Sequence, residues 1–500
     1  MIHIKRSRDE FEYEVRGLTM AFFHGEKIVT KNEEQPMEPD DLTIDMILDE
    51  QKIGISFIKN EIPILMLEKD ADLNNRPEYK NILKQQLYHG LSKLTGKELP
   101  WGTLTGVRPT KLALTQLEEE RGKEEIEHFF KEHYLCSQEK TDLSLQIASR
   151  ELDILRKIDY KNGYSVYIGI PFCPTTCLYC SFTSYSIGAY RDYVDSYLNA
   201  LFQEIDYARQ ALPDKLISIY IGGGTPTTLN EEQLERLLIK VVNSFRMSNV
   251  REFTVEAGRP DSITYEKLRL LKQYGVTRIS INPQTMNQKT LDIIGRRHTI
   301  KQIEDAFFMA RELGHTNINM DLIIGLPGED VKEVDYTLSR MEQLKPDNLT
   351  IHTLAIKRAA NLNIYRERYQ DLHFGDASHM LLKTQTFAKQ QGYVPYYLYR
   401  QKNMSDNLEN VGYAKPGMEC IYNILIMEEK QTILALGAGA SSKFVFHNEG
   451  RIERVENVKD VKEYITRINE MIDRKKTFIE KVYLDGNDSN AGDGKYQSGH

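Results

Sequence analysis

The sequence predicts an α/β fold: a partial barrel of six β/α units, preceded by an N-terminal α+β module and followed by a smaller C-terminal domain. Two observations lead to this prediction. Before about position 70, apolar and polar residues alternate as in the strands of a small sheet; from Ser165 onward, short apolar runs alternate with amphipathic helices, as in parallel β/α units. The six runs are Val166 to Ile170, Ile217 to Ile221, Phe253 to Glu256, Arg278 to Asn282, Ile318 to Ile324 and Leu349 to Leu354.

The N-terminal module is predicted from three strands and one helix. Apolar residues from Leu42 to Leu48, from Ile53 to Phe57 and from Ile64 to Leu67 indicate the strands. Apolar residues at helical spacing between Tyr79 and Leu94 predict the helix, and Gly96 stands where a C-terminal cap is expected. We therefore expect five parts: the module over 1–100, a helical connector over 101–162, the barrel over 163–356, a substrate-covering domain over 357–484, and a disordered, polar tail over 485–500.

Composition and charge narrow the class of protein. A chain of 500 residues with a net charge of -8 can bury more than one core and lacks the basic surface that nonspecific nucleic-acid binding requires. No stretch reaches the roughly 18 to 20 apolar residues of a membrane-spanning helix, and the first residues do not resemble a secretory signal. We expect a soluble, cytoplasmic protein that binds no nucleic acid.

Three of the five cysteines, Cys173, Cys177 and Cys180, lie within eight positions directly after the first run. Three thiolates on a short loop can hold an iron-sulfur cluster and leave one iron open to a further ligand. Disulfides are disfavoured by the odd count and the missing signal, and zinc would want a fourth ligand, for which no histidine lies close in sequence. Zinc, redox and structural sites remain the alternatives, and Cys136 and Cys420 are expected to be free thiols.

The C-x3-C-x2-C spacing, with Tyr179 before the last cysteine, resembles the signature of radical S-adenosylmethionine (SAM) enzymes. The context Tyr167-x-x-x-Pro-Phe-Cys narrows the resemblance to the oxygen-independent coproporphyrinogen III oxidases, or dehydrogenases, and their relatives. Gly169 is a departure, because that branch usually has a histidine there. The resemblance covers roughly residues 167–355 and implies a 4Fe-4S cluster on the three cysteines, with SAM chelated to the open iron.

Polar and glycine residues follow the predicted strands at their carboxyl ends, where β/α barrels place their chemistry. Three consecutive glycines, Gly222 to Gly224, let a backbone approach a ligand closely, although a tight turn is the alternative. A carboxylate such as Glu256 at a strand end is costly to bury without a partner, and for Asp321 the alternative is a helix or turn cap. The resemblance implies that SAM is contacted by Tyr167, Tyr179, Gly223, Gly224, Thr225, Glu256, Gln284, Arg296, Asp321 and Ala355.

The same resemblance implies a reaction and its partners. A 5'-deoxyadenosyl radical would abstract hydrogen from a propionate of coproporphyrinogen III, and loss of carbon dioxide and an electron would leave a vinyl group. The implied partners are this tetrapyrrole and an electron donor such as flavodoxin or ferredoxin. Cations to meet the substrate carboxylates are expected among Lys357, Arg358, Arg366, Arg368 and Arg400, with solvated surface charge as the alternative.

A related heme chaperone is the rival, and a radical reaction on another substrate is a further alternative. Phe182 favours the chaperone, because the oxidases often have a further cysteine at this position. The His-Asn-x-x-Tyr-Trp heme motif of the chaperones, however, appears here only as Tyr422-Asn-Ile-Leu-Ile-Met427 and lacks the histidine. The sequence therefore favours the enzyme.

Overall fold

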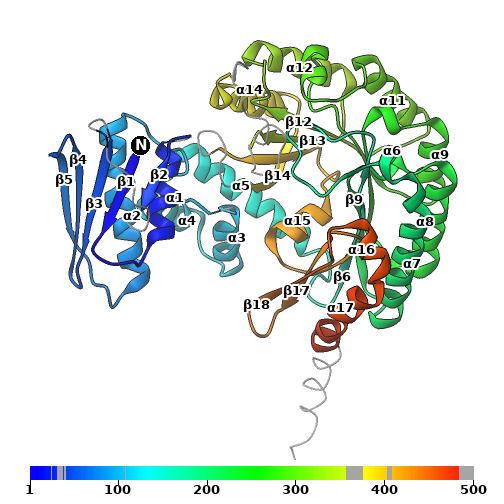
Figure 1. Ribbon diagram of the computed structural model, residues 1–500, viewed down its shortest axis with the longest axis horizontal. Helices are drawn as coiled ribbons and strands as arrows, with labels where there is room; N and C mark the ends of the chain where they lie inside the picture. The colour runs from blue at the N-terminus through cyan, green and yellow to red at the C-terminus, as the bar shows by residue number, and fades with distance from the viewer. Residues whose placement is uncertain are drawn as a thin grey trace, which may run out of the picture. The chain divides into compact units, whose positions relative to one another are not determined.

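The computed structural model (Figure 1) describes residues 1–23, 25–30, 38, 41–106, 108–355, 375–401 and 408–483. The chain divides into two compact units, one of Met1–Leu152 with Leu398–Asn410 and one of Asp153–Tyr397 with Val411–His500. The predicted division into five parts stays a prediction, and the predicted tail lies outside the described residues.

The first unit contains a five-stranded sheet in the order β2-β1-β3-β4-β5. β1 pairs in parallel with β2 on one side and with β3 on the other. β3, β4 and β5 form two successive antiparallel hairpins. The strands are β1 (Ile2–Arg6), β2 (Ile28–Thr30), β3 (Leu42–Leu48), β4 (Lys52–Lys59) and β5 (Ile62–Asp70). The three predicted strands are confirmed, whereas β1 and β2 were not predicted because five-residue and three-residue strands show too little alternation to stand out.

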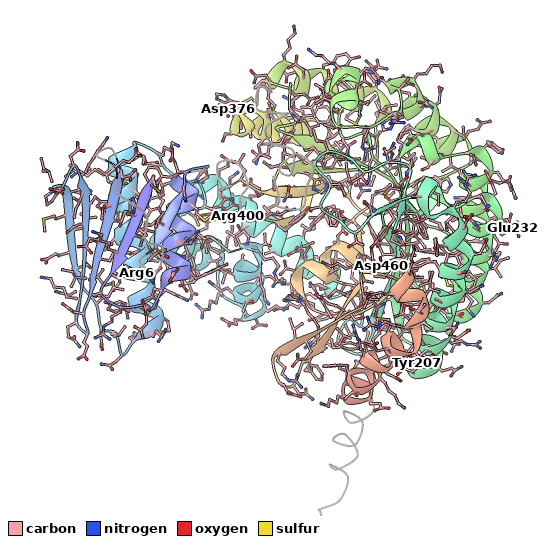
Figure 2. All side chains as sticks on the ribbon, in the orientation of Figure 1. Arg6, Tyr207, Glu232, Asp376, Arg400 and Asp460 are labelled. Carbon is pink, nitrogen blue, oxygen red and sulfur yellow. The ribbon has the colours of Figure 1, made fainter. Side chains whose placement is uncertain are left out.

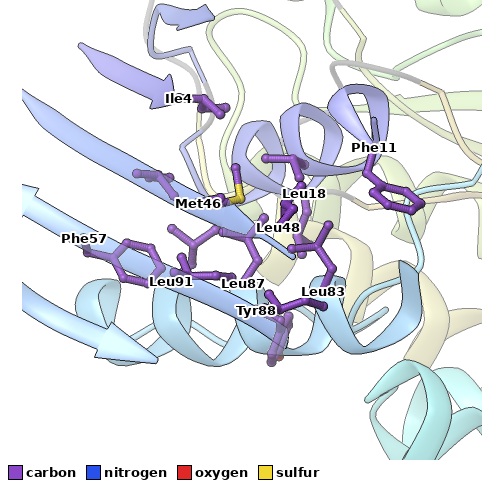
Figure 3. Packing of buried hydrophobic residues seen from close by; sticks show 14 of the residues in the cluster. Ile4, Phe11, Leu18, Met46, Leu48, Phe57, Leu83, Leu87, Tyr88 and Leu91 are labelled. Atoms are coloured by element: carbon purple, nitrogen blue, oxygen red, sulfur yellow. The ribbon is translucent and has the colours of Figure 1, made fainter. Parts of the chain in front are cut away.

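Two helices, α1 (Glu12–Phe22) and α2 (Arg76–Thr95), cover one face of this sheet with apolar side chains (Figure 3). The predicted helix is α2, and it ends at Gly96, whose φ of 67° is in the left-handed region that glycine adopts without strain. Further helices fill the predicted connector: α3 (Thr110–Glu118), α4 (Lys123–His128), a π-helical turn (Phe129–His133) and α5 (Gln138–Leu155).

The second unit is built on one eleven-stranded sheet in the order β14-β15-β13-β12-β11-β10-β9-β6-β16-β17-β18. The six predicted runs form six neighbouring parallel strands of this sheet. They are β6 (Tyr164–Ile170), β9 (Leu216–Gly223), β10 (Glu252–Gly258), β11 (Arg278–Ile281), β12 (Ile318–Ile324) and β13 (Asn348–Thr353). Nearly every residue of these strands is buried, which explains why they appear in the sequence as continuous apolar runs.

Helices between the strands run along the outside of the curved sheet (Figure 1), which gives the predicted partial barrel. They are α7 (Val194–Ala211), α8 (Glu231–Ser244), α9 (Tyr265–Gln273), α10 (Gln288–Ile293), α11 (Ile300–Glu312) and α12 (Val331–Leu344). Asn230, Thr299 and Asp330 begin α8, α11 and α12 with reciprocal capping boxes, so the helix starts are encoded locally.

The C-terminal segments extend the barrel sheet at both ends. β16 (Thr432–Leu436) pairs in parallel with β6, and β15 (Asn410–Ala414) pairs antiparallel with β13. Asp376 and Asp460 cap α14 (Ala377–Gln390) and α16 (Val461–Thr466) (Figure 2). The remaining elements are β7 (Phe172–Cys173), β8 (Tyr185–Ser186), α6 (Ile187–Tyr190), β14 (Val394–Tyr399), α15 (Ile421–Glu428), β17 (Ser441–Phe446), β18 (Arg451–Glu456) and α17 (Ile468–Tyr483).

Across the described residues, we find no helix with both the length and the apolar character that crossing a membrane demands.

Candidate active site

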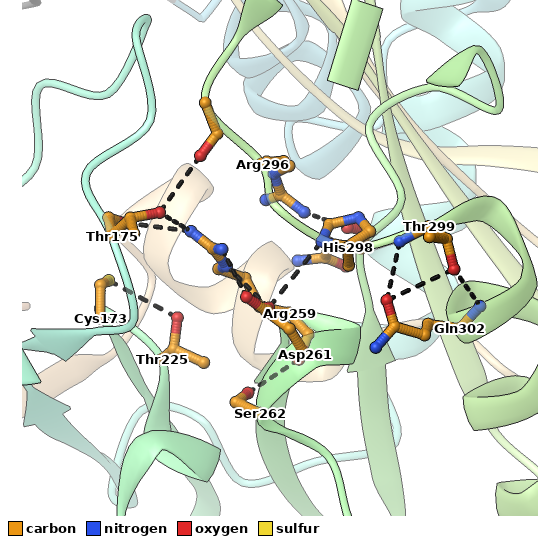
Figure 4. Close-up of polar contacts among 12 residues, drawn as sticks. Cys173, Thr175, Thr225, Arg259, Asp261, Ser262, Arg296, His298, Thr299 and Gln302 are labelled. Carbon is orange, nitrogen blue, oxygen red and sulfur yellow. Dashed lines mark hydrogen bonds and ion pairs between the residues drawn. The ribbon is translucent and has the colours of Figure 1, made fainter. Parts of the chain in front are cut away.

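The three clustered cysteines follow β6, at the carboxyl end of the barrel strands. Cys173 is shown in Figure 4. All three thiols are free, and the backbone N–H of Cys180 donates to the carbonyl of Cys177 at 3.1 Å. Burial raises the pKa of Cys173 to about 11, so metal binding there would release a proton. Among the described residues, no three or more His, Cys, Asp or Glu side chains already form a group arranged as metal ligands.

The glycines at the end of β9 and directly after it pack against the cysteine loop. The N–H of Gly224 donates to Ile170 at 2.8 Å, and the N–H of Thr225 donates to the carbonyl of Phe172 at 2.7 Å. A Cβ atom on Gly224 would lie 2.6 Å from the Phe172 oxygen and 3.0 Å from Cys173 Sγ, distances that require something to move. The absence of a side chain at Gly224 is therefore needed for the close contact between the end of β9 and the cysteine loop. A tight turn alone would not require it.

A stack of three tyrosines connects two barrel strands to α15. Tyr167 and Tyr220 are direct cross-strand partners, with ring centroids 6.2 Å apart. Tyr422 stacks on Tyr220 at 4.5 Å and lies 6.3 Å from Tyr167, with nearly parallel planes. The sequence predicted only Tyr167 for the site; a tyrosine inside an otherwise apolar run was the available signal for Tyr220.

Glu256 is held by Tyr220, one of these three tyrosines. The hydroxyl of Tyr220 donates to Glu256 Oε1 at 2.5 Å. Burial, partly opposed by this hydrogen bond, raises the pKa of the Glu256 carboxyl to about 7. The partner that the sequence analysis required for a buried carboxylate is thus a tyrosine, and the carboxyl can hold a proton near neutral pH.

Asp321 on β12 lies beside His352 on β13. The Asp321 Oδ2 to His352 Nε2 distance is 3.8 Å, and Asn319 Nδ2 donates to Asp321 Oδ1 at 2.7 Å. Burial alone would raise the pKa of Asp321, but the contacts with His352, Asn319 and Thr350 outweigh burial and lower it. Asp321 is therefore an ionised strand residue rather than a helix or turn cap, and His352 is a neighbour that the sequence did not predict.

Gln284 and Arg296 each carry a buried polar atom that no hydrogen bond satisfies, Gln284 Oε1 and Arg296 Nε. The backbone of Gln284 is held in the left-handed region (φ 69°) by hydrogen bonds to Asp321 and Ile323, a strain that favours a functional role. Burial would lower the pKa of Arg296, but the adjacent Tyr179 and Cys177 raise it overall. Since buried polar groups normally find partners, these two atoms fit a polar ligand.

Most predicted cofactor residues are thus linked by direct contacts. A Cβ atom on Gly222 would lie 3.0 Å from the Glu256 carboxyl, and one on Gly223 would lie 3.2 Å from the Tyr167 hydroxyl. The Thr225 hydroxyl lies 3.5 Å from Cys173 Sγ. Ala355 lies two residues after the end of β13 and is half-buried.

The predicted substrate cations Lys357, Arg358, Arg366 and Arg368 lie outside the described residues. Arg400 belongs to the first unit, where it is buried, donates to the carbonyl of Leu104 at 2.6 Å and stacks over the ring of Trp101. These contacts give Arg400 a structural role. Cys136 and Cys420 are buried free thiols, as predicted.

Residues 167–341 match the family model of the Radical SAM superfamily. The chain is 44% identical to the oxygen-independent coproporphyrinogen-III oxidase-like protein HemZ of Bacillus subtilis, over 84% of each chain. It belongs to the radical SAM family, in the group of coproporphyrinogen III oxidases and their close relatives. Its cofactors are accordingly a 4Fe-4S cluster and SAM, and the predicted family, fold class and cofactors are confirmed.

Two further members of the group that are similar to this radical SAM protein differ from each other in function. The heme chaperone HemW of Bacillus subtilis is 35% identical over 61% of this chain and 76% of its own length. The crystallised coproporphyrinogen III oxidase HemN of Escherichia coli, described as a radical SAM enzyme, is 25% identical over 64% of this chain and 73% of its own, with a TM-score of 0.52. Enzymes and chaperones are thus both among its relatives.

Proposed function

We propose that this protein is a cytoplasmic radical SAM oxidoreductase that decarboxylates coproporphyrinogen III oxidatively to protoporphyrinogen IX, without oxygen, in heme biosynthesis. The observation that carries the proposal is the close packing of the glycine strand end against the cysteine loop, in a chain so similar to a coproporphyrinogen-III oxidase-like protein along most of its length. A one-electron donor such as flavodoxin or ferredoxin would reduce the cluster.

Cys173, Cys177 and Cys180 would hold the cluster as thiolates and leave one iron open for SAM. The bound cluster and SAM supply a 5'-deoxyadenosyl radical. The residues proposed to contact SAM are Tyr167, Tyr179, Gly223, Gly224, Thr225, Glu256, Gln284, Arg296, Asp321 and Ala355. Their fit rests on the buried unsatisfied atoms of Gln284 and Arg296 and on glycines that leave space where side chains would collide.

The chain's own residues would orient the reactants and exclude water. The stacked rings of Tyr167, Tyr220 and Tyr422 form an aromatic surface that excludes water from one side of the site. Tyr220 donates to Oε1 and so fixes the direction of the Glu256 carboxyl, which can hold a proton near neutral pH. Asp321 stays ionised beside His352 and offers a fixed negative charge to a cationic or hydroxyl group.

The second candidate is a heme chaperone, which is favoured by the similarity to HemW and by Phe182, at the position where the oxidases often have a further cysteine. Against this candidate, the position matched to the chaperone histidine is Tyr422, which is buried and stacked 4.5 Å from Tyr220. A buried phenol in a ring stack is poorly suited to ligate an incoming heme iron. The oxidase therefore remains the first proposal.

The deciding experiment is an anaerobic assay of reconstituted protein with SAM, a reductant and coproporphyrinogen III, read for protoporphyrinogen IX and 5'-deoxyadenosine. We expect both products, and neither from Cys173→Ala. In parallel, heme is titrated into the protein and followed by its absorbance. Tight heme binding without substrate conversion would replace the oxidase with the chaperone. SAM cleavage with neither conversion nor heme binding would indicate a radical reaction on another substrate.

A further inference from the structure

Arg259, at the end of β10, reaches across the strand ends to the middle of the cysteine loop (Figure 4). Its Nη1 donates to the carbonyl oxygen of Thr175 at 3.1 Å and to Thr175 Oγ1 at 2.6 Å. Thr175 lies halfway between Cys173 and Cys177, so these bonds act on the turn that sets the spacing of the first two thiols. The arginine side chain is almost completely buried, and thus it is held in one place.

Asp261 fixes the other side of the same guanidinium. Arg259 Nε donates to Asp261 Oδ1 at 3.0 Å, and Nη2 donates to Oδ2 at 2.6 Å, a two-pronged pairing that sets the plane of the fork. His298, buried, lies with its Nδ1 3.8 Å from Asp261 Oδ1. The carboxylate offsets the arginine charge, so Arg259 offers the loop directed hydrogen bonds with little net charge.

The same threonine ties the loop to the segment that carries Arg296. Thr175 Oγ1 donates to the carbonyl of Gly295 at 3.2 Å, and the N–H of Leu178 donates to Ile294 at 3.0 Å. One hydroxyl therefore joins the cysteine loop, β10 and the Ile294–Arg296 segment. A shift of the cysteine loop would therefore also displace Arg296, which lies beside Cys177 and Tyr179.

The two buried arginines differ in how their charge is balanced. Arg259 has a carboxylate partner in Asp261, whereas Arg296 forms no salt bridge within the described ranges and has Cys177 and Tyr179 as its neighbours. Removing the loop contacts of Arg259 changes geometry, and removing Asp261 would expose an additional positive charge close to the thiols.

From these contacts we infer that Arg259 is a positioning residue for the cysteine loop. With Asp261 it holds the turn between Cys173 and Cys177 in the conformation that binds the cluster, and Asp261 keeps the arginine charge from shifting the cluster's reduction potential. This inference rests on the cofactor part of the proposed function and is independent of the substrate.

The test compares Arg259→Lys, Thr175→Val and Thr175→Ser in the full-length, anaerobically reconstituted protein. Iron release to a chelator is followed by absorbance, and backbone deuterium exchange of the loop is measured before reconstitution. Arg259→Lys and Thr175→Val should release iron about tenfold faster, as expected when one hydrogen bond to a charged group is lost, and the loop should exchange faster. Thr175→Ser, which keeps the hydroxyl, should behave like the unaltered protein.

Arg246→Lys is the matched control, because Arg246 forms an exposed pair with Asp214 in the same unit. Asp261→Asn removes the negative charge that offsets Arg259 and keeps a side chain of similar shape. It should raise the midpoint potential of the cluster, measured by redox titration with electron paramagnetic resonance. Unchanged iron release and exchange in Thr175→Val would overturn the inference even if Arg259→Lys failed to fold. Unaltered protein that binds no cluster would instead overturn the cofactor part of the proposed function.

Discussion

The hydrophobic core of the first unit and the loops at the carboxyl ends of the barrel strands bury different kinds of residue. The core of the first unit is apolar: Ile44 and Phe57 of the sheet and Leu87 of α2 belong to it, whereas Met66 on the edge strand β5 is exposed. The loops at the carboxyl ends of the barrel strands bury charged side chains, Arg259 after β10 and Arg296 after β11 among them. A buried charge needs partners to offset its desolvation, so buried charges at these strand ends, beside the cysteine loop, mark the region selected for chemistry rather than for stability alone.

The largest effect should come from the cluster cysteines. Cys173→Ala, Cys177→Ala and Cys180→Ala should each abolish cluster binding, because three thiolates are the minimum for a site with one open iron. Iron analysis and visible absorbance after anaerobic reconstitution measure this. Cys136→Ser in the first unit and Cys420→Ser in the second are the controls and should keep the cluster. Full iron loading in all three alanine variants would show that the cysteine loop does not bind the cluster, and the strand ends of the second unit would then have no chemical role that sets them apart from the first unit.

Gly224→Ala should lower both iron content and SAM affinity severalfold. The added Cβ would collide with Phe172 and Cys173, so the cysteine loop itself must move. Gly54→Ala in the first unit is the control, because its Cβ would meet only ordinary contacts near Ile47. Equal iron contents in the two variants would count against this packing.

Lys475→Met should destabilise the second unit by about 3–5 kcal/mol, the usual cost of leaving one half of a buried ion pair uncompensated. Lys475 Nζ donates to Glu204 Oε1 at 2.6 Å, and both side chains are buried. Denaturant unfolding, followed by fluorescence and circular dichroism, gives the free energy. The neighbouring exposed Lys476→Met should lie within about 0.5 kcal/mol of the unaltered protein. Similar losses in both variants would show that burial of the pair is unimportant.

Glu256→Gln should produce the smallest effect, a change in the pH dependence of stability. The pKa of about 7 in the folded protein lies above the ordinary carboxyl value of 4.5, so the folded state holds the proton more tightly. This contribution is fully present below about pH 4.5 and is lost as the pH rises through 7. The variant should therefore lose less stability than the unaltered protein between pH 5 and 8, as measured by thermal unfolding. Parallel pH profiles would mean that Glu256 titrates normally.

The sequence was most informative where structure is local or where strands are wholly buried. The barrel strands were recognisable because burial on both faces requires continuous apolar runs, and Gly96 marked a helix end through its backbone conformation. The stack of Tyr220 on Tyr422 and the bonds from Arg259 to Thr175 could not be predicted, since they join residues far apart in the chain. The periodicity of apolar residues in a sequence does not indicate which distant side chains are in contact.

The pairing of β6 with β16 has a consequence for synthesis. Ile168 lies opposite Leu436, which follows it in the chain by 268 residues. While the ribosome makes the intervening segments, the strand that leads into the cysteine loop lacks its neighbour on one side and presents an unpaired edge. The first strand of the barrel to be synthesised is thus completed almost last, and a chain truncated before residue 432 would carry its three clustered cysteines after an unfinished edge.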